Sequence, residues 1–154
     1  MEKNKKDLIK KRDRARCNTV KTILEAYRIS LNLIDEYKKE IKEKQDKISY
    51  LRSSLSSLSE VKGSSMAKDD VIIRELDKIS ELESEIQAIK AETDQVKKAI
   101  SSIDDPIAKA IVIRIWINKT DSMRSLASYF NLSSTMIWRK SDIVLLRLYK
   151  KLLF

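Results

Sequence analysis

The stretch LASYFNLSSTMIWRK, residues 126–140, decides the fold because it predicts two short helices that cross at a steep angle. Apolar or small side chains fall where such helices must bury residues against each other, namely Leu126, Ala127, Phe130, Leu132 and Ile137. Asn131 stands at the turn, where the backbone needs a positive φ that Gly and Asn tolerate. The Ser133 hydroxyl can accept the first N–H groups of the second helix. The pattern predicts a helix-turn-helix, which places its second helix in the major groove of DNA.

Flanking signals place this unit in a C-terminal domain over residues 104–154. Asp105 followed by Pro106 predicts a helix start, because Asp caps helices and Pro suits the first helical position. An apolar helix then runs to Trp116, and we expect a supporting helix over 122–130 and a recognition helix over 134–153. One stripe of the recognition helix should face the core: Ile137, Ser141, Val144, Leu148 and Leu152. The leucine-rich C-terminal tail either completes this core, which we favour, or docks on a partner.

Residues 17–103 predict a helical hairpin, because two segments repeat apolar side chains in alternating steps of three and four. The first segment comprises Ile34, Tyr37, Ile41, Lys44, Ile48, Leu51, Leu55 and Leu58. The second comprises Ile79, Leu82, Ile86, Ile89, Thr93, Val96, Ile100 and Ile103. Lys44 and Thr93 interrupt the two seams. We expect Lys44 to extend its amine into water rather than to fix the register.

A Ser-rich loop near residues 59–68, which contains Gly63, predicts the reversal of the hairpin. Ser65 with Asp69 and Asp70 suits the start of the second helix, since acidic groups favour a helix N-terminus. The first helix is expected to begin near Asn18. Residues 1–16 form a basic arm that either contacts phosphate or is a solvated, partly disordered terminus. The hairpin either closes on itself or pairs between two chains, which would form a homodimer.

The composition indicates an all-α protein and excludes much chemistry. Charged residues make up 36% of the 154 residues, with one Gly, one Pro, one Cys and no His. Without His there is no Ser-His-Asp triad or His-containing zinc site, and one Gly excludes a P-loop. We therefore expect no enzyme, no metal and no cofactor. No apolar run is long enough for a membrane span, so we expect no membrane association and a cytoplasmic location. The net charge is +9, and the two ends of the chain are basic whereas the middle is not.

The order of these features resembles a known family. A helical hairpin with a Ser/Gly loop is followed by Asp105-Pro106, by an apolar helix that ends in Trp116-Ile117-Asn118, and by Leu126-Ala127 with the turn. About residues 30–154 are similar to the ArpU/RinA-like transcription regulators of phages and prophages of Gram-positive bacteria. The C-terminal domain of that family is similar to region four of bacterial sigma factors. The resemblance implies sequence-specific binding of double-stranded DNA in a bacterial host cell. It also implies activation of late phage genes, with a sigma-like contact to RNA polymerase.

In this interpretation the recognition helix contacts bases through Ser134, Thr135, Trp138 and Arg139. Arg139 is the candidate for a bidentate bond to guanine, and Thr135 can touch a thymine methyl group. Trp138 packs either on the DNA or in the core beside Ile137, and we favour the core. The candidate phosphate contacts are Lys119, Arg124, Ser133, Lys140, Lys150 and Lys151.

Two other functions remain open at the level of sequence. The chain can be a protein-binding module that acts through the hairpin on polymerase or on a host or phage protein. It can also be a DNA-recognition component that resembles a small terminase subunit, which would require a ring-forming oligomer. The sign of regulation, the operator and the oligomeric state do not follow from the residues.

Overall fold

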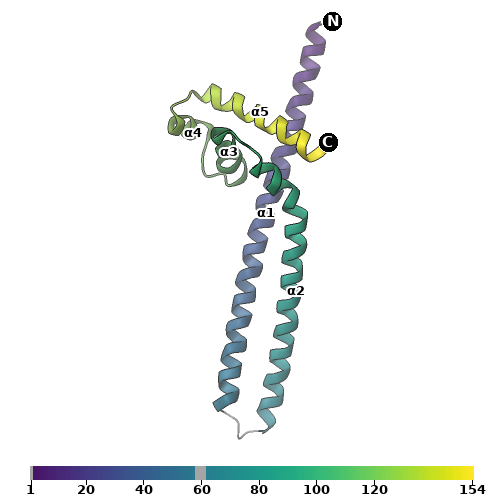
Figure 1. Ribbon diagram of the computed structural model, residues 1–154, viewed down its shortest axis with the longest axis vertical. Helices are drawn as coiled ribbons and strands as arrows, with labels where there is room; N and C mark the ends of the chain where they lie inside the picture. Colours follow the sequence, from purple (N-terminus) through teal and green to yellow (C-terminus); the bar gives the residue numbers. More distant parts are fainter. Residues whose placement is uncertain (1, 58–61) are drawn as a thin grey trace. The chain divides into compact units, whose positions relative to one another are not determined.

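The computed structural model describes residues 2–57 and 62–154, and every regular element in this part of the chain is a helix (Figure 1). The all-α prediction is therefore confirmed. The elements are, in order, α1 (Glu2–Ser57), α2 (Lys62–Ser101), α3 (Pro106–Ala110), the π-helix η1 (Ile111–Ile117), α4 (Met123–Phe130) and α5 (Ser134–Leu153).

The helices form two compact units. The terminal unit comprises Met1–Ser30 and Thr93–Phe154, and the hairpin unit comprises Leu31–Glu92. The terminal unit therefore combines both ends of the chain, and it contains α3, η1, α4 and α5 entirely. The two units also differ in charge. The terminal unit has 21 basic and 9 acidic side chains, a net charge of +12, whereas the hairpin unit has 11 and 14, a net charge of −3.

The expectation that the first helix begins near Asn18 is wrong, because α1 begins at Glu2 and runs for 56 residues. The basic arm over residues 1–16 is thus helical from Glu2 onward and continuous with the rest of α1. Its residues are mostly Lys, Arg, Glu, Asp and Ala with no Gly or Pro, and Lys, Arg, Glu and Ala are good helix formers. Cys17, Val20 and Leu24 are buried and anchor the next turns of the helix. A helix that is nucleated there extends toward the N-terminus at little cost.

The second helix also begins earlier than the serines suggest. Helix α2 begins at Lys62, so residues 62–68 of the expected loop are helical, and residues 58–61 lie outside the described residues. Gly63 is tolerated near the helix start because the first N–H groups of a helix have no intrahelical acceptor in any case. Asp69 and Asp70 therefore lie beyond the first turn of α2 and do not begin it.

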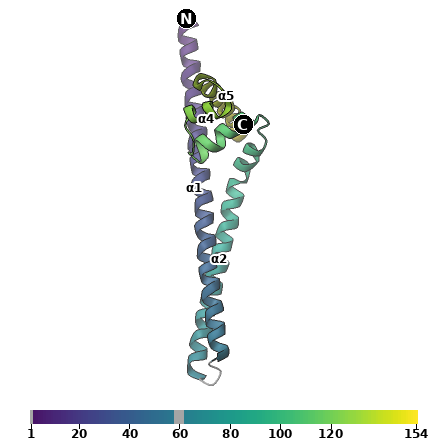
Figure 2. The same cartoon turned by 90° about the vertical axis from the view of Figure 1, so that its left-hand side faces the viewer.

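In the hairpin unit, α1 and α2 run antiparallel along the predicted seam (Figure 1). Ile48, Ile72 and Ile79 are buried together, with Ile41 and Leu51 packed against them. The described seam positions within this unit are all buried or half-buried. The predicted seam positions Leu55 and Leu58 lie outside the side chains that the structure describes. The two helices cross in the view of Figure 2, as helices that wind around each other do.

Lys44 does not extend into water as expected, because Glu75 of the facing helix binds it. The Lys44 Nζ lies 3.1 Å from Oε2 of Glu75, and the Lys47 Nζ lies 3.1 Å from Oε1 of the same carboxylate. The Lys44 and Glu75 side chains are only 17% and 8% exposed. Hydrogen bonds from both lysines hold the pKa of Glu75 below its usual value. This ion pair joins two apolar layers of the seam, so a shifted register would leave charges buried without a partner.

The core of the terminal unit draws on four separate segments. Its buried members are Cys17, Val20 and Leu24 of α1, Ala99 and Ile100 of α2, Ala108, Val112 and Ile117 of α3 and η1, and Val144, Leu145 and Leu148 of α5. The leucine-rich C-terminal tail therefore completes the core, as favoured from the sequence, although Leu153 and Phe154 at the very end are exposed. Among the described residues, no helix has both the length and the apolar character that crossing a membrane requires.

The ion pair in the hairpin makes a prediction about acid stability. Glu75→Gln removes the carboxylate, so we expect the melting temperature at pH 7 to fall by a few degrees. The folded-state pKa of Glu75 is lowered, so its stabilisation is present above the ordinary Glu pKa of about 4.3 and is lost as the pH falls through the folded value. The difference between the two proteins should therefore shrink below about pH 4. Thermal unfolding followed by circular dichroism from pH 3 to 7 measures it.

The matched control is Glu81→Gln, which neutralises an exposed carboxylate on the same helix. We expect this control to change the melting temperature little at any pH. Equal effects of the two substitutions at pH 7 would contradict the role of Glu75 in the seam.

Candidate nucleic-acid interface

The turn between α4 and α5 has the backbone geometry that the sequence predicts. Asn131 ends α4 in the left-handed region, at φ 55° and ψ 43°. The Leu132 N–H donates to the Ala127 carbonyl at 2.9 Å and closes the turn. The Ser133 Oγ accepts the N–H of Met136 at 3.1 Å and caps α5. These three contacts fix the point at which the chain leaves α4 and enters α5.

The two helices of this unit share a small core of their own with the helices before them. Leu126 and Ile137 are fully buried, and Ile111, Ile115, Met123 and Ala127 complete the cluster. Phe130 and Leu132 pack against it, so every apolar position predicted for the crossing takes part in the packing. The two predicted helices and the turn between them are thus present over α4 and α5.

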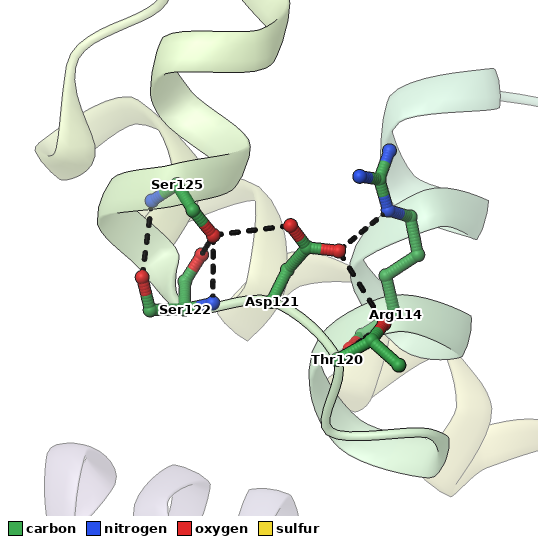
Figure 3. A network of polar contacts seen from close by, with 5 residues as sticks. All are labelled: Arg114, Thr120, Asp121, Ser122 and Ser125. Carbon is green, nitrogen blue, oxygen red and sulfur yellow. Dashed lines mark hydrogen bonds and ion pairs between the residues drawn. The ribbon is translucent and has the colours of Figure 1, made fainter.

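A polar network holds the segment between η1 and α4 (Figure 3). The Arg114 Nε lies 2.7 Å from Oδ2 of Asp121, and the Ser125 Oγ donates to Oδ1 of the same carboxylate at 3.1 Å. Ser122 and Ser125 cap α4 reciprocally, each side-chain oxygen accepting the other's backbone N–H. The hydrogen bond from Arg114 is the main cause that lowers the pKa of Asp121. Asp121 is therefore ionised at neutral pH and ties the start of α4 to η1.

The apolar helix predicted before the turn is not a plain α-helix. After α3, whose Asp105 N-cap accepts the Ile107 N–H at 3.0 Å as predicted, the chain continues as the π-helix η1. The Asn118 N–H bonds to the Ile113 carbonyl five residues back, at 2.8 Å. Each turn of a π-helix takes up more residues, which changes the direction of the side chains after it. The periodicity of the sequence did not predict the π-helix η1.

Trp116 joins η1 to α5 in a way that the sequence did not suggest. Its indole Nε1 donates to the Oγ of Ser141 at 2.9 Å, and Ser141 is fully buried. The Lys21 Nζ of α1 lies over the Trp116 ring, 4.3 Å from its centre. Ser141 was predicted to face the core, and this bond explains how a polar residue is accommodated there.

The predicted base-contacting residues are exposed together on the first two turns of α5. Ser134, Thr135 and Arg139 are all exposed, and Thr135 and Arg139 lie opposite the buried Ile137. The interpretation of Trp138 as a core residue is wrong, because 48% of its surface is exposed. It lies one residue past Ile137, so the helix turns it away from the core toward the side on which α1 packs. The structure thus brings all four residues to one accessible end of α5.

Trp138 borders a cleft between α5 and the N-terminal turns of α1. The cleft has a volume of about 520 Å³ and is lined by Lys10, Asp13, Arg14, Cys17, Asn18, Lys21, Trp138, Asp142 and Leu146. Next to it the Cys17 Sγ approaches the Asp142 carbonyl at 3.9 Å, and the Arg16 guanidinium lies 5.0 Å from the centre of the Tyr149 ring. Sequence reasoning did not place α1 against α5, since contacts over more than 100 residues leave no local pattern.

The predicted phosphate-contacting residues are more scattered. Ser133 and Arg124 are exposed at the starts of α5 and α4. Lys119 is exposed at φ 53° and pairs with Glu25 at 3.4 Å. Lys150 and Lys151 are exposed at the far end of α5, about 17 Å along the helix from Arg139. The structure therefore does not gather these residues into one site.

Lys140 has a structural partner. Its Nζ lies 3.3 Å from Oδ2 of Asp105, and the lysine side chain is 31% exposed. Burial alone would raise the pKa of Asp105, but hydrogen bonds from the Ile107 N–H and from Lys140 outweigh it and lower the pKa. Lys140 thus links α5 to the start of α3, which accounts for a lysine on the partly buried side of the helix.

Within the part of the chain that the structure describes, no group of three or more Cys, Asp or Glu side chains is arranged to hold a metal ion. Comparison of the chain with protein-family models, with curated proteins and with solved structures gave no match. A function for the chain therefore has to be inferred from the geometry and charge of the terminal unit itself.

The bond between Trp116 and Ser141 predicts a measurable coupling. Trp116→Phe removes the donor and keeps an aromatic ring, whereas Ser141→Ala removes the acceptor. Each single change leaves a partner group without its bond, so we expect each to lower the free energy of unfolding by roughly 1–3 kcal/mol. The double variant should lose less than the sum, by about 1 kcal/mol. Urea unfolding of the four proteins measures this, and strictly additive effects would contradict the bond.

Proposed function

We propose that the chain is a sequence-specific DNA-binding transcription regulator that reads the major groove with α5. The observation that carries the proposal is the exposed start of α5, which presents Ser134, Thr135 and Arg139 from a capped helix-turn-helix. An α-helix fits the major groove, where each base pair offers a distinct pattern of donors and acceptors. The net charge of +12 on the terminal unit supplies the attraction to phosphate that such binding needs.

Each exposed residue of α5 has a role in this proposal. The Arg139 guanidinium donates two parallel hydrogen bonds to O6 and N7 of a guanine. Thr135 lies one turn earlier and contacts a thymine methyl group, while Ser134 donates to a phosphate at the entry of the helix. Trp138 lies at the border of the DNA major groove and packs its ring against a sugar or a base. Arg124 and Ser133 neutralise or bind the phosphates on either side of the turn.

The hairpin unit supports a further part of the proposal. It is a separate compact unit with a net charge of −3, so it is unsuited to follow the DNA backbone. A protein partner is the better match, either RNA polymerase or a second copy of the chain. This arrangement agrees with the resemblance to the ArpU/RinA-like regulators, in which DNA binding serves the activation of late phage genes. The proposed place of action is therefore the bacterial host cell.

Arg139→Ala tests the reading function. A preferred duplex is first selected with the wild-type protein from a random-sequence pool, and fluorescence anisotropy then measures Kd for the selected and the random duplex. We expect the variant to lose roughly ten- to a hundredfold of the preference for the selected duplex, because a bidentate contact to guanine discriminates by about 1–3 kcal/mol.

The matched control is Arg147→Ala, which removes an exposed arginine two turns further along α5. This control should keep the preference for the selected duplex and lose only a little affinity for both duplexes. Failure of the wild-type protein to enrich any sequence, or an unchanged preference in Arg139→Ala, would contradict the proposal.

A further inference from the structure

The first turns of α1 carry a row of cations on one side. Lys3, Lys10, Arg14 and Lys21 succeed one another at steps of seven, four and seven residues, which places them on one face of a helix. One carboxylate, Asp7, lies on the same face between Lys3 and Lys10. Residues 2–12 and Arg14 are exposed. In Figures 1 and 2 the turns nearest the N-terminus extend past α5, with no other described element of the terminal unit beside them.

This row of cations lies beside the exposed end of the recognition helix. Lys10, Arg14 and Lys21 line the same cleft as Trp138 and Asp142 of α5. Two carboxylates, Asp13 and Asp142, also line it. Asp13 pairs with Arg12 at 3.2 Å, on the same helix. The positive side of α1 thus begins at the edge of the proposed base-reading surface and continues away from it toward Lys3.

We infer that the N-terminal turns of α1 form a rigid phosphate-binding arm, which runs along the DNA backbone next to the base pairs that α5 reads. This inference rests on the proposed DNA binding by α5. From Lys3 to Arg14 the helix is about 17 Å long, which matches the axial rise of roughly five base pairs. The arm therefore extends the protein's contact with DNA to one side of the sequence that Arg139 reads.

DNA suits this arm better than a membrane surface. A basic helix that lies on lipid needs a continuous apolar face opposite its cations. Between Glu2 and Arg16 the large apolar side chains are Leu8 and Ile9 alone, and these neighbours point about 100° apart on a helix. They do not form an apolar face. The cations lie next to Trp138, and these turns of α1 lack an apolar face. Both observations favour nucleic acid as the partner of the arm.

The test compares two triple variants that remove the same charge. Lys3→Gln, Lys10→Gln and Arg14→Gln neutralise the arm. The control combines Lys38→Gln, Lys39→Gln and Lys42→Gln, which neutralises exposed lysines of the hairpin unit. Anisotropy at 50 to 300 mM salt gives Kd for the selected and the random duplex. Circular dichroism and the melting temperature check that both variants are folded.

We expect the arm variant to lose affinity for both duplexes equally, by ten- to a hundredfold at about 150 mM salt. The slope of log K against log salt should become shallower by about 2.7, because three phosphate contacts are lost. Its preference for the selected duplex should remain. Hydroxyl-radical footprinting of the wild-type protein should show backbone protection over roughly five base pairs on one side of the selected site, absent in the arm variant.

The outcomes separate the arm from the proposed function. If the arm variant kept its salt slope and footprint while Arg139→Ala lost sequence preference, the phosphate-binding arm would be overturned. The proposed DNA-binding function would stand. If the slope became shallower in the arm variant but the wild-type protein had no sequence preference, phosphate binding by the arm would be supported. Base reading by α5 would be contradicted. The inference would be overturned if the arm variant and the hairpin control lost the same affinity for DNA. It would also be overturned if the arm substitutions abolished binding to phosphatidylserine vesicles and left DNA binding unchanged.

Discussion

The packing of the second half of α5 against α1 is the constraint on which the terminal unit depends. Leu145 and Leu148 of α5 share one buried cluster with Val20 and Leu24 of α1, residues more than 100 positions away in the chain. Because these turns of α5 are held in that cluster, the turns before Ser141 lie outside it, and their side chains are exposed except for Ile137 and Lys140. One continuous helix therefore has a structural half and an accessible half, and the accessible half is where the proposed recognition occurs.

Three polar contacts of the terminal unit hold α5 and the elements around it in place. Ser141 bonds to Trp116, Lys140 pairs with Asp105, and Asp121 joins Arg114 to the start of α4. None of these groups belongs to the exposed face of α5. A recognition surface needs such support, since residues that read bases must be held in a fixed geometry before the DNA arrives. The π-helix η1 carries two of these supporting side chains and so sets their direction.

The features that sequence predicted correctly are those with a local signal. Asn131 at a left-handed turn, Ser133 as a cap and the seam of the hairpin each depend on residues within a few turns of one another. The pairing of Lys44 with Glu75 was missed, because it depends on the register between two helices that no local pattern fixes. The place of Trp138 was missed for a similar reason, since its surroundings include α1, at the other end of the chain.

The central claim is that the exposed start of α5 is the surface that meets DNA, and nuclear magnetic resonance tests it most directly. The isotope-labelled protein of 17.9 kDa is titrated with a selected duplex, and backbone amide shifts are followed for each residue. The account predicts that the largest changes fall on residues 133–142 and on the first turns of α1, while residues 31–92 change little. Changes centred on residues 31–92, or no changes on residues 133–142, would contradict it.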